Sequence, residues 1–170
     1  YILHQKNFDS VLVFCSSKIS VKQLTRELKR TSLAVEEIHS DLEQEKREEV
    51  LMYFKSGRIK VLVATDILSR GIDIDNIGLV LNYDVPHDGE DYVHRIGRTA
   101  RAAAEGTAIT FISVKEQRKF AAIERLLGKP VQKEKVPEQF GEAPEYTPAA
   151  SLPRGAGGGG NSRKPQHFKR

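Results

Sequence analysis

A basic stretch, Tyr92–Arg101, holds side chains that are suited to binding phosphate. If it is helical, His94, Arg98 and Arg101 lie within one narrow arc, and Arg95 points about 100° away from them. Guanidinium groups match phosphate oxygens in a two-pronged geometry, and clustered cations repel one another unless an anion offsets their charge. The spacing therefore indicates a phosphate site. A solvated basic face, or a salt-bridge network with the acidic residues just before the stretch, also explains it. Those acidic residues are Asp88, Glu90 and Asp91.

A second candidate site follows the apolar run 61–65, in the connection 66–77. In open α/β sheets, ligands bind at the connections beyond the carboxyl ends of strands. Thr65 offers a hydroxyl to a phosphate, and Asp73 is an acceptor suited to a ribose hydroxyl. An Asp- and Gly-rich turn that only bends the chain explains the same residues. The other polar or glycine positions of this candidate are Asp66, Arg70 and Gly71.

A third candidate is the start of the predicted helix after His39, where Gln44 and Arg47 lie one turn apart. The N-terminus of a helix favours anions through its dipole and its free N–H groups. An ordinary capped surface helix explains these residues as well. Ser17, which follows the first apolar run, is either a helix N-cap or a phosphate donor.

Other chemistry has little support in the sequence. Cys15, the only cysteine, is expected to be a buried core residue, and it excludes an intrachain disulfide. The histidines are scattered without ligand spacing, so no metal site is expected. The sequence holds no Gly-x-x-x-x-Gly-Lys-Ser/Thr loop and no Asp-Glu-Ala-Asp sequence. The chain alone is therefore not expected to bind a nucleoside triphosphate together with its metal ion.

Short apolar runs without strict alternation must position these candidates, and such runs are typical of strands buried on both faces. Helical periodicity separates them, so the sequence predicts an α/β fold with a parallel sheet of five or more strands and helices on both faces. Capping boxes at Ser40–Glu43 and Ser113–Glu116 predict helix starts, and Gly57 and Gly128 predict helix ends. The predicted strands are 11–15, a weaker 34–38, 61–65, 79–83 and 107–112.

The charge is unevenly distributed along the 170 residues. Residues 1–128 hold 19 basic and 19 acidic side chains, whereas residues 129–170 hold 8 basic and 4 acidic ones. We expect a linker end or leading helix over 1–8, one domain over 9–128, and a basic, Gly/Pro-rich, mostly disordered tail over 129–170. The chain starts at Tyr1 without an initiator Met and is expected to be a piece of a longer polypeptide. Without an apolar run of membrane-spanning length, and with one cysteine, a cytoplasmic location is expected.

Four stretches, taken in order, resemble motifs IV, IVa, V and VI of DEAD-box RNA helicases. They are Val11–Ser17, His39–Gln44, Ala64–Asp73 and His94–Arg101. The resemblance covers about residues 1–128 and implies the second of the two RecA-like domains of such a helicase. The Gly-rich basic tail is similar to that of several bacterial members, such as the RhlE-like group.

The resemblance implies roles at an ATP site. Arg98 and Arg101 are the arginine fingers that reach the γ-phosphate, and His94 belongs to the coupling between the ATP and RNA sites. Asp73, with Gly71, contacts the ribose of ATP. The phosphates and Mg²⁺ are implied to be held by the N-terminal RecA-like domain of the same polypeptide, which is the implied protein partner.

The resemblance also implies an RNA site that holds the sugar-phosphate backbone. Its residues are Ser17, Gln44, Arg47 and Thr65, with Arg70 linking the RNA and ATP sites. Two positions depart from the family pattern, because Ser40 and Ala100 stand where glycines are usual. Ala is the smallest step from Gly, so tolerance is expected.

The sequence thus predicts the C-terminal domain of an ATP-dependent RNA helicase, monomeric in isolation and inactive without its partner domain. The rival hypothesis from another class is a non-enzymatic RNA-binding or annealing module whose basic tail does the binding. A DNA-directed helicase domain is disfavoured by the wording of the motifs.

Overall fold

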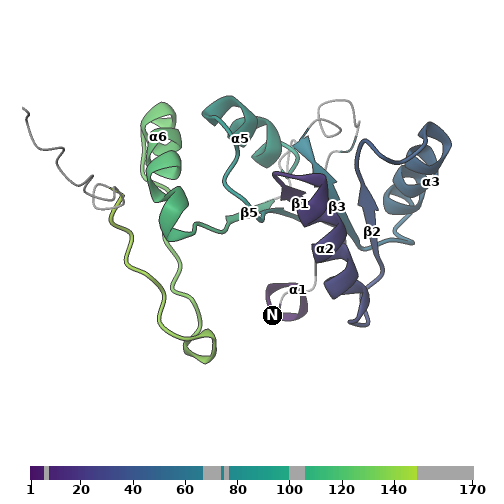
Figure 1. The fold of residues 1–170 in the computed structure, drawn as a ribbon, viewed down its shortest axis with the longest axis horizontal. Helices are drawn as coiled ribbons and strands as arrows, with labels where there is room; N and C mark the ends of the chain where they lie inside the picture. The colour runs from purple at the N-terminus through teal and green to yellow at the C-terminus, as the bar shows by residue number, and fades with distance from the viewer. Residues whose placement is uncertain (6–7, 67–73, 75–76, 100–105, 149–170) are drawn as a thin grey trace, which may run out of the picture.

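The five strands form one parallel sheet in the order β2-β3-β1-β4-β5 (Figure 1). The computed structural model describes residues 1–5, 8–66, 74, 77–99 and 106–148. The strands are β1 (Val11–Cys15), β2 (Val35–Ile38), β3 (Val61–Thr65), β4 (Leu79–Asn82) and β5 (Thr107–Thr110). The predicted parallel α/β sheet is confirmed, and the weakest predicted strand is the edge strand β2.

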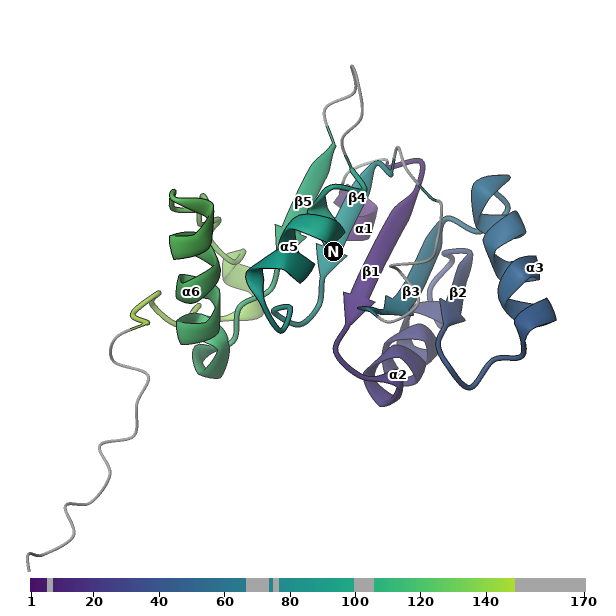
Figure 2. The same cartoon turned by 90° about the horizontal axis from the view of Figure 1, so that it is seen from above.

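Helices cover both faces of the sheet, as expected (Figures 1 and 2). They are α1 (Ile2–Gln5), α2 (Lys18–Lys29), α3 (Gln44–Lys55), α5 (Gly89–Ile96) and α6 (Gln117–Leu127), with 3-10 turns at Val114–Glu116 and Glu138–Phe140. Successive β1 residues point to opposite faces, so Val13 packs in the cluster of α2, whereas Phe14 packs in that of α3. None of the described helices has the length and apolar character to cross a bilayer.

The helix starts follow the sequence in one case and depart from it in the other. The box at Ser113 and Glu116 forms as predicted and opens the turn that leads into α6. The box predicted at Ser40 is wrong, because α3 begins only at Gln44, with Glu43 at its N-cap. The reason is a turn at His39: its Nδ1 accepts from the Asp41 N–H at 3.2 Å, and its carbonyl accepts from the Leu42 N–H at 3.1 Å. Gly57 (φ +73°) and Gly128 (φ +67°) end helices as expected.

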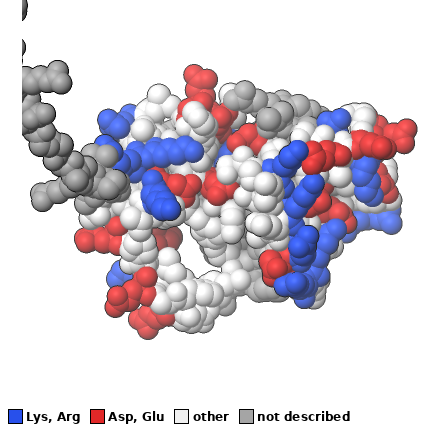
Figure 3. Space-filling view, viewed as in Figure 1, with Lys and Arg blue, Asp and Glu red and all other residues white. Residues whose placement is uncertain are grey.

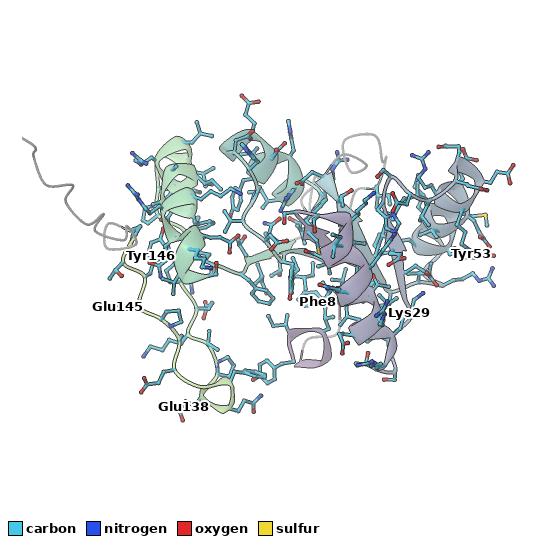
Figure 4. The ribbon with its side chains drawn as sticks, in the orientation of Figure 1. Phe8, Lys29, Tyr53, Glu138, Glu145 and Tyr146 are labelled. Carbon is cyan, nitrogen blue, oxygen red and sulfur yellow. The ribbon has the colours of Figure 1, made fainter. Side chains whose placement is uncertain are left out.

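The chain comes back to α6 at Tyr146 and Thr147, within the stretch 129–170 that the sequence predicts to be mostly disordered. The Tyr146 hydroxyl donates to Glu124 at 2.7 Å, and the Thr147 N–H donates to the Gln117 side chain at 2.8 Å (Figure 4). Burial, followed by the neighbouring Glu124 carboxylate, raises the pKa of Tyr146. The Tyr146 ring also packs edge-on against Phe120, so this segment extends the core beyond residue 128. The rest of the predicted tail, 149–170, lies outside the described residues.

Candidate functional site

Four of the predicted RNA-binding residues lie where adjacent parallel strands end. Thr65 is the last residue of β3 and is in register with Cys15, the last residue of β1. Ser17 follows β1 by two residues, and Gln44 begins the helix after β2. Because all strands are parallel, β2, β3 and β1 bring these residues to one edge of the sheet, the carboxyl edge. Arg47 lies one turn further along α3, and Arg70 lies outside the described residues.

The hydrogen bonds that these side chains already make within the fold determine which of their polar atoms a ligand can contact. The Ser17 hydroxyl accepts from the Ser20 N–H at 3.1 Å, so the N-cap interpretation is confirmed. The exposed Gln44 amide donates to Glu48 at 2.6 Å. The Nε atom of Arg47 is buried and finds no acceptor among the described residues. An unsatisfied buried donor costs about 1–3 kcal/mol, so an incoming oxygen acceptor there would be favourable.

The basic stretch after β4 forms a shorter helix than predicted. Asp88 caps α5 by accepting from the Asp91 N–H at 2.9 Å, and the helix ends at Ile96, with Gly97 at its C-cap. Glycine is a poor helix former, and Arg98 continues the chain in a turn instead. His94 is exposed on the helix, whereas Arg98 lies beyond its end, so the condition for a single arc, an uninterrupted helix, is not met at Arg98. The third member of that arc, Arg101, lies outside the described residues.

Arg98 lies at the amino edge of the sheet, opposite Ser17 and Thr65. Its carbonyl accepts from the Ile77 N–H at 3.1 Å, and Ile77 precedes β4 by two residues. The four residues of β4 separate the two edges by about 13 Å. The connection after β3 passes from one edge to the other, with Ile74 buried in the core on the way. Gly71 and Asp73 of this connection lie outside the described residues, as does Ala100.

A buried arginine ties the two candidate regions together. Arg95, 2% exposed, forms a two-pronged ion pair with Asp66, in which Nε and Nη2 lie 2.5 and 2.6 Å from the carboxylate oxygens. Its Nη1 donates to Asn82 Oδ1 at 2.9 Å and to the Asp84 carbonyl at 3.1 Å. The guanidinium also stacks 5.0 Å from the centre of the Phe14 ring. These contacts fix α5 against the carboxyl ends of β3, β1 and β4.

No partner for Arg95 is predicted from the sequence, although its position in the helix carries a signal. The helical spacing turns Arg95 about 100° away from His94 and Arg98, which means toward the sheet. A buried cation needs a carboxylate, and Asp66 directly follows a buried strand. The salt-bridge alternative thus has a real counterpart, but Arg95 pairs with Asp66 rather than with the acidic residues before the helix.

Gly106 is required by a close approach of the chain. A Cβ atom at this position would lie 2.0 Å from the carbonyl oxygen of Thr99. Thr99 is itself held by its hydroxyl, which donates to the Ile96 carbonyl at 2.9 Å. Thr99 and Gly106 flank the segment that contains Arg101, so both ends of that segment are fixed beside the turn of Arg98.

Cys15 and the acidic residues give no sign of other chemistry. Cys15 is fully buried, and burial raises its pKa to about 12, so the thiol stays protonated and unreactive, as expected of a core residue. Among the described residues, no three His, Cys, Asp or Glu side chains gather as metal ligands would.

Comparison with known proteins identifies the family. The model described as helicase conserved C-terminal domain matches residues 1–103. The ATP-dependent RNA helicase DbpA of Bacillus subtilis is 46% identical over 138 residues, which cover 81% of this chain and 29% of that protein. The chain thus spans less than a third of this relative.

Solved structures agree. A DEAD box protein from Methanococcus jannaschii has a TM-score of 0.73 at 42% identity, covering 79% of this chain and 37% of that one. A Dbp5 variant of S. cerevisiae, solved bound to RNA and ADP BeF3, has a TM-score of 0.66 at 36% identity, covering 72% of this chain and 33% of that one. The chain therefore belongs to the helicase conserved C-terminal domain family, as the C-terminal domain of a DEAD-box RNA helicase.

Proposed function

We propose that this chain is the second RecA-like domain of an ATP-dependent RNA helicase and that it acts only together with an N-terminal RecA-like domain. The observation that carries the proposal is the placement of two candidate groups at opposite edges of one sheet. The RNA candidates Ser17 and Thr65 lie at the carboxyl edge, and Arg98 lies at the amino edge. Arg95 and Asp66 join the elements that bear them, so that one rigid body carries both groups.

At the carboxyl edge, the proposed ligand is the RNA backbone. Ser17, Gln44, Arg47 and Thr65 offer hydroxyl, amide and guanidinium groups, and Arg70 is proposed to link this edge to the ATP site. Contacts to phosphate and sugar fix the position of a strand but do not read its sequence. The domain would therefore bind RNA with little sequence preference, and a backbone bent on this surface cannot remain in a duplex.

At the amino edge, Arg98 and Arg101 are proposed to reach the γ-phosphate of an ATP held by the N-terminal domain. His94 is proposed to couple this site to the RNA, and Asp73 with Gly71 to contact the ribose. Guanidinium groups stabilise the charge that develops on a transferred phosphoryl group. Because the chain lacks an Asp-Glu-Ala-Asp sequence, whose carboxylates would hold Mg²⁺, we propose that the N-terminal domain holds the ion.

The test of this function uses the full-length protein and the 170-residue chain side by side. Full-length protein is expected to hydrolyse ATP faster when single-stranded RNA is added and to separate a short RNA duplex. The isolated chain is expected to hydrolyse no ATP, with or without RNA. ATP hydrolysis by the isolated chain would contradict the need for a partner domain. Stimulation by DNA strands as strong as that by RNA would contradict the substrate class.

The rival proposal is a non-enzymatic RNA-binding or annealing module. It draws on the last 22 residues, which hold five basic side chains and no acidic one. Because Tyr146 and Thr147 contact α6, the informative truncation ends at Pro148. If the tail does the binding, residues 1–148 lose most of the RNA affinity of residues 1–170, and the loss shrinks as salt rises. Equal affinities would show that residues 149–170 do not contribute to RNA binding.

Three finer points stay predictions from the sequence. They are a cytoplasmic location, a monomeric isolated domain, and membership of the RhlE-like group of bacterial helicases. The relatives named above come from a bacterium, an archaeon and a yeast, and they do not single out that group.

A further inference from the structure

One side of α2 gathers positive charge. Lys18, Lys22, Arg26 and Lys29 follow one another at intervals of three or four residues, which places them within about 80° around the helix axis. Val21, on another side of the helix, is buried against the sheet. Figure 3 shows these charges as a blue column that runs along α2. We call these four residues the α2 stripe.

The α2 stripe is exposed and keeps an excess of positive charge after its ion pairs are counted. The side chains of Lys18, Lys22 and Lys29 are 52%, 46% and 47% exposed, and Lys29 is labelled in Figure 4. Asp41 accepts from both Lys18 and Lys22 at 2.8 Å, and Glu36 accepts from Lys29 at 2.9 Å. Hydrogen bonds from the two lysines lower the pKa of Asp41 to about 2. Two carboxylates thus face four cations.

The next long helix along the chain, α3, has a different charge pattern from α2. Over Lys18–Lys29, α2 has four basic residues and one acidic one, Glu27. Over Gln44–Lys55, α3 has three basic residues and three acidic ones. Lys46 of α3 is paired within the helix, with Glu49 at 2.5 Å. A surface that merely needs solubility is served by the mixed pattern of α3, whereas the α2 stripe favours an anionic ligand.

The position of the α2 stripe indicates which anion it binds. Lys18 directly follows Ser17, and its ion pair with Asp41 joins the stripe to the loop that leads to Gln44. The stripe therefore begins at the proposed RNA residues of the carboxyl edge and runs away from them. From Lys18 to Lys29 it spans about 16 Å, roughly the length of five stacked nucleotides of a single strand.

We infer that the α2 stripe binds the sugar-phosphate backbone of the single RNA strand as it leaves the carboxyl edge. This inference rests on the proposed function, because the carboxyl edge must itself bind RNA. The contact is electrostatic and independent of sequence, so it lengthens the RNA footprint of the domain without adding base recognition.

The test measures the affinity of the 170-residue chain for fluorescent oligouridylates of about 6 and about 20 nucleotides, a range that brackets the usual footprints of single-strand binding domains. A stripe variant carries Lys18→Gln, Lys22→Gln, Arg26→Gln and Lys29→Gln. Its affinity for the long RNA is expected to fall about tenfold or more at low salt, and its salt slope to lose up to about 3 units, or 0.7 for each phosphate contact. Its affinity for the short RNA is expected to stay within twofold.

Two controls test the direction of the effect and its specificity for α2. The variant Asp41→Asn with Glu36→Gln leaves the cations without carboxylates and is expected to bind the long RNA more tightly than the wild type. Two double variants are matched, because each removes two positive charges. One carries Lys22→Gln and Arg26→Gln on α2, and the other carries Lys46→Gln and Lys55→Gln on α3. Only the α2 pair is expected to weaken binding of the long RNA.

Each outcome decides between the inference and the function beneath it. If the wild type binds both RNAs and the stripe variant binds them with the same affinities, the inference is overturned and the proposed function stays intact. If the isolated wild-type chain binds neither RNA, the inference is overturned, and failure of the full-length protein in the same assay would overturn the proposed function itself. If the stripe variant loses affinity only for polyglutamate, and not for RNA, the stripe serves an acidic protein partner and the inference is wrong.

Discussion

Arg95 and Arg98 lie three residues apart and differ in nearly every physical respect. Arg95 is 2% exposed, and its guanidinium is engaged by Asp66, Asn82 and the Asp84 carbonyl. Arg98 lies half-buried past the end of α5, at the opposite edge of the sheet. The same residue type thus serves two purposes within one motif. Burial and position, rather than residue type, separate the arginine that fixes α5 on the sheet from the arginine proposed to act on ATP.

The largest effect expected from this comparison is on turnover at Arg98. In the full-length protein, Arg98→Ala is expected to lower RNA-stimulated ATP hydrolysis by roughly 10³- to 10⁵-fold, the range for arginine fingers. Since Arg98 is half-buried and interacts within the fold, the free energy of unfolding is expected to fall by about 0.5–1.5 kcal/mol, less than for Arg95→Ala. Steady-state kinetics and urea unfolding measure the two quantities.

Arg98→Lys provides the matched control, because lysine keeps the charge and loses the planar fork. It is expected to recover little of the turnover. Near-normal turnover in Arg98→Ala would refute the finger assignment. A large loss of stability would show that Arg98, like Arg95, has a structural role.

The next largest effect is on stability at Arg95. Arg95→Ala removes the two-pronged ion pair with Asp66 and the hydrogen bond to the Asn82 amide oxygen. Breaking a buried ion pair by removing one member costs about 3–5 kcal/mol, which is a large part of the stability of a domain of this size. Urea unfolding followed by circular dichroism measures the loss.

The double variant Arg95→Met with Asp66→Asn separates the ion pair from the packing. Removing both charges avoids a partly buried carboxylate that has lost its guanidinium, so the double variant is expected to be more stable than Arg95→Ala. If Arg95→Ala unfolds at the urea concentration of the wild type, the pair contributes nothing and the contrast between the two arginines fails.

Much of the architecture could be predicted from the sequence because local pattern and global fold agree. Apolar runs such as Val61–Thr65 are buried in the sheet, and the helix-ending role of Gly128 follows from its lack of a Cβ. The prediction of a helix start at Ser40 was wrong because a tertiary feature, the buried His39 side chain, turns the chain there. Sequence periodicity does not contain that contact.

The candidate site was predicted less completely. Residue types and motif order indicated Ser17, Thr65 and Arg98, and the structure places them at two edges of the sheet. The arc of His94, Arg98 and Arg101 depended on an uninterrupted helix, and the helix ends at Ile96, because propensity at Gly97 alone does not fix where a helix ends. The partner of Arg95 lies 29 residues away in the sequence, and only the folded sheet brings the two together.

The smallest expected effect tests how far the network around Arg95 extends. Asn82 is fully buried, and its amide links Arg95 to Thr110, since Oδ1 accepts from Arg95 at 2.9 Å and Nδ2 donates to Thr110 Oγ1 at 3.0 Å. Asn82→Ala is expected to cost about 1–3 kcal/mol, because an Arg95 donor loses its acceptor while the ion pair with Asp66 remains. Thr110→Val removes only neutral hydrogen bonds, those of its hydroxyl with Asn82 and with Tyr92, and is expected to cost about 0.5–1.5 kcal/mol for each. Urea unfolding ranks the two variants against Arg95→Ala. An Asn82→Ala loss as large as that of Arg95→Ala would mean that the amide, and not the ion pair, holds α5 on the sheet.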